Sequence, residues 1–182
     1  MKALLDACVL YPTVLREILI GAARAGLYTP LWSDRILGEW ARAVVKLGPG
    51  AELVAQAEIA ALRAAFPAAA VPAREGLAAR LWLPDPADVH VLAAAIAGGA
   101  DLIVTFNAAD FPRGVLAEEG IVREDPDRFL LGLWRAAHPG DAGRYPRDPA
   151  GEIGPVRRGA AADGRDGGGQ CGPRGAGRGL WR

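Results

Sequence analysis

The sequence is poor in the residues that form disulfides and histidine-based metal sites. Its two cysteines, Cys8 and Cys171, lie far apart, one in an apolar run and one in a glycine-rich segment. A bridge between them is not expected, and Cys8 is interpreted as a small buried hydrophobic residue. The two histidines, His90 and His138, have no neighbour at metal-ligand spacing, which indicates structural or surface roles.

Lysine is equally scarce, with only Lys2 and Lys46. A receiver domain would need a lysine after a late strand, and neither residue lies there. A haloacid-dehalogenase-like phosphatase would need a second acid at position 8, where the chain has Cys8. No glycine follows the first apolar run, so the glycine-rich turn of a dinucleotide-binding domain is also missing.

Long hydrophobic runs are absent as well. The longest apolar stretch, residues 91–100, is about half of a membrane span, and the N-terminal apolar run is too short for a signal peptide. We therefore expect a cytoplasmic protein with no membrane contact. The 51% hydrophobic content is ample for one buried core, within a chain of 182 residues.

Charge is unevenly distributed along the chain. Residues 1–137 hold thirteen Lys or Arg and sixteen Asp or Glu, whereas residues 138–182 hold eight Arg and five acids. The first part is therefore not a basic nucleic-acid binder, and a phosphate ligand there would need a cation or a local arginine cluster. The second part is rich in Gly, Arg, Pro and Ala without apolar periodicity, which predicts disorder. An RNA-binding Arg-Gly tail and a shifted reading frame both remain open for it.

Strand and helix patterns alternate over residues 1–137, which we take as one domain. Such alternation predicts an α/β fold with a parallel sheet flanked by helices. Ligands of such sheets bind beyond the carboxyl ends of the strands. The expected strands are residues 2–5, 102–105 and 120–122, with an extended stretch at 69–71, and the expected helices are residues 12–26, 33–44, 51–66, 85–97, a short one from 111, and 125–134.

Four acidic residues lie beside these elements: Asp6, Glu39, Asp88 and Asp110. Each alone has an ordinary explanation, such as a helix cap, a first-turn acid or a solvent-facing helix residue. Together they lie where one fold can bring them to the same end of a sheet. Converging carboxylates commonly hold a hard divalent cation against a phosphate. The sequence therefore predicts a metal site.

The chain resembles the PIN-domain ribonucleases, the fold of VapC-type toxins, over residues 1 to about 135. The resemblance lies in three segments in a characteristic order: Asp6-Ala7-Cys8-Val9-Leu10-Tyr11-Pro12, the stretch from Trp32 to Trp40, and the stretch from Asp85 to Asn107. It implies a three-layer α/β/α domain. It also implies a metal-dependent endoribonuclease, the toxin of a toxin–antitoxin pair, with Asp6, Glu39, Asp88 and Asp110 as catalytic and metal-binding residues.

The resemblance carries further implications. The cofactor is Mg²⁺ or Mn²⁺, the substrate is RNA, and the partners are a small antitoxin and a second copy in a homodimer. Asn107 stands where many family members have Asp, and with Thr105 it is expected to support the site. Arg16, Arg35 and Arg42 are candidate RNA contacts, although ordinary surface charges explain them equally well. The helix faces of residues 14–22 and 36–44 could receive the antitoxin or face the core. The alternative is a degenerate PIN-like module that binds RNA or protein without cleavage.

Overall fold

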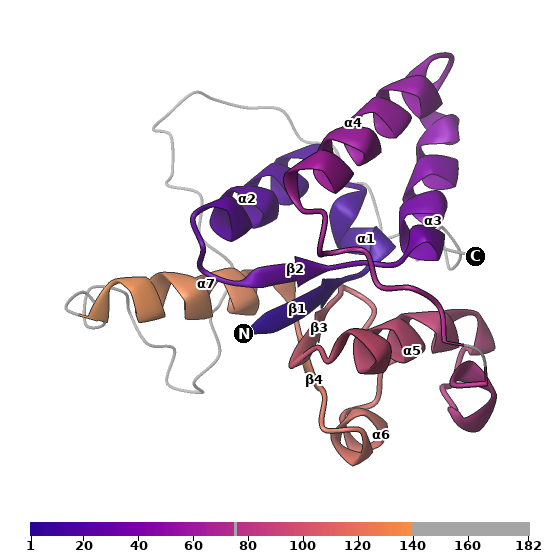
Figure 1. Ribbon diagram of the computed structural model, residues 1–182, viewed down its shortest axis with the longest axis vertical. Helices are drawn as coiled ribbons and strands as arrows, with labels where there is room; N and C mark the ends of the chain where they lie inside the picture. Colours follow the sequence, from indigo (N-terminus) through magenta and orange to yellow (C-terminus); the bar gives the residue numbers. More distant parts are fainter. Residues whose placement is uncertain (75, 140–182) are drawn as a thin grey trace, which may run out of the picture. The chain divides into compact units, whose positions relative to one another are not determined.

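The computed structural model describes residues 1–74 and 76–139. Disorder is expected for residues 138–182, and this segment lies outside the described residues except for residues 138 and 139. Strands and helices alternate along most of the chain (Figure 1). The strands are β1 (Lys2–Leu5), β2 (Thr29–Leu31), β3 (Leu102–Val104) and β4 (Val122–Glu124). The helices are α1 (Ala7–Leu10), α2 (Thr13–Arg24), α3 (Asp34–Val44), α4 (Ala51–Ala65), α5 (Val89–Gly98), α6 (Arg113–Glu118) and α7 (Pro126–Ala137), with short 3-10 turns η1 (Val45–Leu47), η2 (Ala78–Arg80) and η3 (Pro86–Asp88).

The four strands form one parallel sheet in the order β2-β1-β3-β4. In the register, Leu4 of β1 lies opposite Leu31 of β2 and Ile103 of β3. Because all strands run the same way, their carboxyl ends meet at one edge of the sheet. The α/β class with a parallel sheet is confirmed.

Central strands β1 and β3 are apolar on both faces, as expected for a parallel sheet covered by helices on both sides. Leu4, Leu5, Ile103 and Val104 have no exposed surface. In the view of Figure 1, helices α2, α3 and α4 lie above β1 and β2, and α5 and α6 lie below them. Buried side chains from the sheet and the helices form one hydrophobic core.

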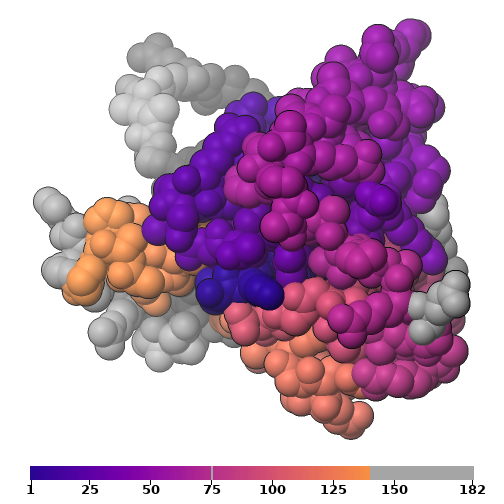
Figure 2. Space-filling model, viewed as in Figure 1, coloured from indigo at the N-terminus to yellow at the C-terminus, as the bar shows by residue number. Residues whose placement is uncertain are grey.

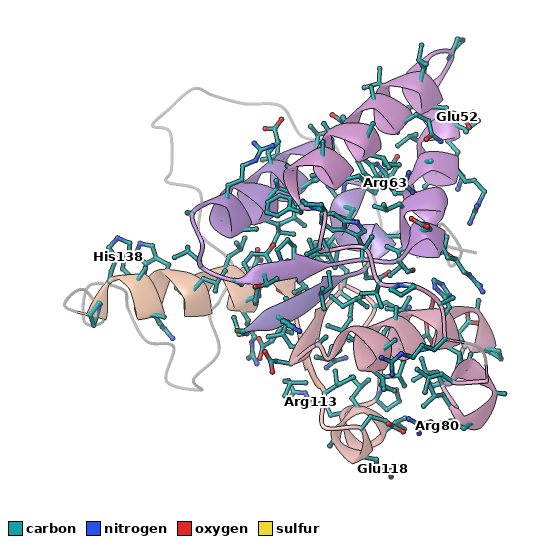
Figure 3. The ribbon with its side chains drawn as sticks, viewed as in Figure 1. Glu52, Arg63, Arg80, Arg113, Glu118 and His138 are labelled. Atoms are coloured by element: carbon teal, nitrogen blue, oxygen red, sulfur yellow. The ribbon has the colours of Figure 1, made fainter. Side chains whose placement is uncertain are left out.

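Helix α3 shows how the sequence forms one of these layers. Ser33 caps its first turn by accepting a hydrogen bond from the Ile36 amide over 3.2 Å. Apolar residues at helical spacing, including Leu37 and Trp40, are buried against the core. Arg63 of α4 reaches Asp34 at the start of α3 over 2.8 Å, so the two helices are also joined at their surface (Figure 3).

Glycine permits the close packing of α5 against the sheet. A Cβ atom at Gly98 would lie 2.9 Å from Leu31 Cδ1 and 2.8 Å from Val71 Cγ2. These separations are shorter than carbon atoms tolerate, so the helix could not approach as closely with a larger residue. The close approach fixes the end of α5 against β2.

The sequence prediction missed two elements. Strand β2 was not predicted, since its three residues are too few to show a period of two. Helix α1 was also missed, and the part of the apolar run that contains Cys8 is therefore helical. The extended stretch at residues 69–71 forms a single bridge, Trp32 to Ala70, and no strand. No helix of the described residues is long and apolar enough to cross a bilayer.

Candidate active site

Asp6 directly follows β1 at the carboxyl edge of the sheet. Its backbone is extended and its amide donates to the Val104 carbonyl over 3.2 Å, which continues the β1–β3 pairing by one residue. Its carboxylate Oδ2 accepts hydrogen bonds from Thr105 Oγ1 over 2.7 Å and from Cys8 Sγ over 3.2 Å. Only 9% of Asp6 is exposed, so these donors compensate for the loss of water around the charge.

Thr105 occupies the corresponding position after β3. Its amide donates to the Glu124 carbonyl over 3.1 Å, and the residue is 2% exposed. The hydroxyl oxygen also accepts a hydrogen bond from the Asn107 amide over 2.9 Å. One side chain thus joins the Asp6 carboxylate to the loop that follows β3.

Asp88 lies at the start of α5, where Asp85 caps the preceding turn by accepting from the Ala87 amide over 2.9 Å. Asn107 Nδ2 donates to Asp88 Oδ2 over 2.8 Å, which joins α5 to the loop after β3. Burial raises the pKa of Asp88 from its ordinary value of 3.8 to about 6, with further contributions from the negative charges of Asp6, Asp85 and Asp110. Those three carboxylates are therefore close enough for their charges to act on Asp88.

Asp110 lies in the same loop and is half-buried. Its amide donates to Asn107 Oδ1 at the long distance of 3.4 Å. The side chain of Asn107 thus bridges Asp88 and the backbone of Asp110. The charges of Asp6 and Asp110 both act on Asp88, and we refer to these three residues as the acidic cluster.

Glu39, the fourth predicted acid, projects from α3 and makes different contacts. His90 Nε2 of α5 lies 2.9 Å from Glu39 Oε1, and Arg35 Nε lies 3.3 Å from the same oxygen. Burial opposes ionisation of Glu39, but the hydrogen bonds and charges of His90 and Arg35 outweigh it and lower the carboxyl pKa. Arg35 Nη2 also donates to the Ala87 carbonyl over 3.3 Å. Glu39 therefore couples α3 to α5 beside the cluster.

The three candidate RNA-binding arginines lie in different environments. Arg16 is buried, donates to the Leu10 carbonyl over 2.7 Å, pairs with Glu58 and stacks over Trp40 at 4.5 Å. Its assignment as an RNA contact is wrong, because the guanidinium is occupied inside the protein. Arg35 and Arg42 are exposed, and Arg35 lies next to the acids through Glu39.

Sequence reasoning overlooked two residues of this region. His90 was expected to have a structural or surface role, and the contact of its ring with Glu39, which joins α5 to α3, was not foreseen. Cys8 was interpreted as a hydrophobic residue, but its thiol donates a hydrogen bond to the Asp6 carboxylate. The sulfur also accepts a hydrogen bond from the Phe106 amide over 3.3 Å. Burial, followed by the charge of Asp6, raises the pKa of the Cys8 thiol to about 12, so it is a neutral donor rather than a nucleophile. The short spacings Asp6–Cys8 and Asp88–His90 were the available signals.

The residues present fit a hard divalent cation in their chemistry. Carboxylate, amide and hydroxyl oxygens are the ligand types that Mg²⁺ and Mn²⁺ prefer, and a cation would relieve the mutual repulsion of the acids. Within residues 1–74 and 76–139, no three Asp, Glu, His or Cys side chains already converge on an ion-sized point. Mg²⁺ commonly takes only one or two protein carboxylates and keeps its water, so a site of few direct ligands is compatible with it.

Comparison with protein families agrees with this arrangement. The PIN domain model matches residues 2–109, which include all the site residues except Asp110. The chain belongs to the PIN domain family. PIN domains are generally nucleases, and they usually use divalent metal ions. No curated protein matches the chain, and no solved structure matches it.

Proposed function

We propose that this protein is a metal-dependent endoribonuclease that hydrolyses RNA phosphodiester bonds in the cytoplasm. The observation that supports this most is the placement of Asp6 and Asp88 at the carboxyl edge of the sheet, where Thr105 and Asn107 hold their carboxylates by hydrogen bonds. A cluster of this kind would repel a phosphate by itself and attract it through a cation.

The chain's own residues would orient the reacting groups. A bound Mg²⁺ or Mn²⁺ would supply Lewis acidity and a water of lowered pKa. Asp6 and Asp88 would be its main protein ligands, with Asp110 adding charge. Thr105 fixes the Asp6 carboxylate, and Asn107 fixes that of Asp88. These hydrogen bonds hold the carboxylates in place before a ligand arrives, which lowers the cost of organising the site.

Glu39 has a supporting part in this proposal. Its carboxylate, held ionised by His90 and Arg35, adds negative charge beside the cluster. Arg35 is exposed and lies at this edge, where it could contact an RNA phosphate, and Arg42 lies on the same helix. Exchanging either arginine for alanine should weaken RNA binding with little loss of stability.

The test uses the purified full chain with single-stranded and structured RNA, in Mn²⁺, in Mg²⁺ and in chelator. Metal-dependent cleavage is expected for the wild type and should fall at least about a hundred-fold in Asp6→Asn and Asp88→Asn. Asp101→Asn is the matched control, because Asp101 precedes β3 at the end of the strand away from the candidate site. There its carboxylate accepts a hydrogen bond from the Lys2 amide. Cleavage that persists in both site variants would indicate a contaminating nuclease and refute the assignment.

A second candidate function is an RNA- or protein-binding module without cleavage. Asn107 favours this function, because it is a neutral residue where many family members have an acid. A second argument is that, within the described residues, the carboxylates do not converge on one point. RNA binding by the wild type, with no cleavage in either metal, would support this module over the nuclease.

We propose that the protein acts as the toxin of a toxin–antitoxin pair. In this proposal it binds a small antitoxin protein and forms a homodimer with a second copy of the same chain. Exposed apolar side chains offer contact surfaces: Val14 and Ile18 on α2, and Leu47 and Leu53 where α3 meets α4. This junction projects from the surface (Figure 2). The face of residues 36–44 is excluded, because its apolar side chains are buried. Induced expression should arrest growth, and Asp6→Asn should abolish the arrest.

A further inference from the structure

An aromatic side chain is exposed beside the acidic cluster. Phe106 is 52% exposed, although its neighbours Val104 and Thr105 are buried and Phe111 of the same loop has no exposed surface. Leaving a large apolar ring in water forgoes the stabilisation that burial would give. Single exposed apolar side chains are common on protein surfaces, so the significance of Phe106 lies in its position next to residues that bond to Asp6 and Asp88.

The backbone at Phe106 is firmly held. Its amide donates to Cys8 Sγ over 3.3 Å, and its carbonyl accepts from the Ala108 amide over 3.0 Å. Thr105, the preceding residue, donates a hydrogen bond to the Asp6 carboxylate, and Asn107, the following residue, donates one to the Asp88 carboxylate. The backbone that carries the exposed ring is therefore held in place next to residues that bond to Asp6 and Asp88, so a ligand that contacts the ring would lose little entropy in ordering this segment.

We infer that Phe106 stacks against an unpaired base of the RNA, next to the phosphate held at the acidic cluster. The inference rests on the proposed ribonuclease function and adds a residue of this chain that would position the substrate. A phenyl ring has a face for stacking but no hydrogen-bonding group, so it accepts any base. Bases within a duplex are stacked on each other and are not available to a side chain.

The contact makes a specific prediction about chemistry. Phe106→Trp keeps an aromatic face, whereas Phe106→Leu keeps an apolar side chain but removes the stacking surface. The leucine variant should bind single-stranded RNA about ten-fold more weakly and lose a similar factor in kcat/KM, and the tryptophan variant should lie within about two-fold of wild type. Melting temperatures should be nearly unchanged, since the side chain is half in solvent.

The experiment uses a single-stranded oligoribonucleotide series in which one position at a time is abasic or carries 2-aminopurine. In Mn²⁺, 2-aminopurine fluorescence is recorded on mixing, before products accumulate, and cleavage is then followed. At one abasic position the difference between wild type and Phe106→Leu should disappear, and 2-aminopurine there should be quenched by wild type only. A leucine effect that is the same at every abasic position would overturn the inference.

The two proposals fail separately. If wild type cleaves and Phe106→Leu matches it in binding and rate, stacking is wrong and the nuclease stands, with a protein contact as the remaining explanation of the exposed ring. If the quenching pattern appears but no protein variant cleaves, the nuclease is wrong and stacking stands. Wild type that neither binds nor cleaves single-stranded RNA refutes both.

Discussion

Asn107 Nδ2 donates a hydrogen bond to Asp88 Oδ2 over 2.8 Å, and it joins the loop after β3 to the start of α5. A neutral amide therefore stands where an additional carboxylate would have increased the repulsion around Asp88. The same side chain accepts from the Asp110 amide. Asn107 thus organises two acids while leaving the negative charge of the cluster smaller.

Replacing this amide by a carboxylate should exchange stability for metal affinity. Asn107→Asp removes the donor to Asp88 and adds a like charge, so in chelator we expect a loss of about 1–2 kcal/mol in the free energy of unfolding. The rise in melting temperature on adding Mn²⁺ should exceed that of wild type. Asn107→Ala, the control, should lose stability without gaining a larger metal response. Equal metal responses in the two variants would contradict this role.

The raised pKa of Asp88 predicts a pH dependence of stability. Its folded pKa of about 6 lies above the unfolded value of 3.8, so its stabilising contribution is complete below the unfolded value and is lost as pH rises through about 6. The lowered pKa of Glu39 acts in the opposite direction and at lower pH, below its ordinary 4.5. Urea unfolding in chelator from pH 4 to pH 7 should therefore show a decline that Asp88→Asn reduces. A decline of the same size in the variant would refute the assignment to Asp88.

The same proton should compete with a metal ion. Because Asp88 must lose its proton to ligate a cation, the melting-temperature rise with Mn²⁺ should be larger at pH 7.5 than at pH 5.

Arg16 should be a stability residue rather than a substrate contact. Arg16→Met leaves the Leu10 carbonyl without this donor and Glu58 without its partner, so we expect a loss of about 2–4 kcal/mol. The loss is smaller than for a fully buried ion pair because Glu58 is partly exposed to solvent. Arg42→Ala, on an exposed arginine, should change stability by less than about 0.5 kcal/mol. Thermal unfolding distinguishes the two, and a negligible loss in Arg16→Met would contradict the buried contacts.

Two glycine-to-alanine exchanges should have opposite signs. Gly98→Ala places a methyl group against Leu31 and Val71 and should cost about 1–3 kcal/mol. Gly21→Ala in α2 meets nothing within 4 Å and should stabilise the protein by about 0.5–1 kcal/mol through a better helix propensity. Denaturant midpoints measured side by side test both. A tolerated Gly98→Ala would mean that α5 can shift away from the sheet.

Several features followed from local sequence. Ser33, Asp85 and Asp125 accept hydrogen bonds from the first turns of their helices. Ser33, Asp85 and Asp125 had been predicted as helix starts, because capping depends on residues only two or three positions apart. The α/β class was predictable for a similar reason, since alternating strand and helix patterns have few ways to bury their apolar faces. The positions of the acids beside these elements were also visible, although their grouping in space was not.

The sequence by itself settled the alternation of strands and helices apart from β2 and α1, the helix caps, and the positions of the acids beside these elements, because those depend on neighbours along the chain. Only the tertiary structure decided which side chains that are distant in sequence come into contact. Arg16 is buried, whereas Arg35 is exposed. His90 contacts Glu39, and Asn107 contacts Asp88. Contacts of this kind depend on the strand order β2-β1-β3-β4 and on how closely α5 packs against the sheet. No local pattern encodes these distances, since they arise only when distant segments are packed together.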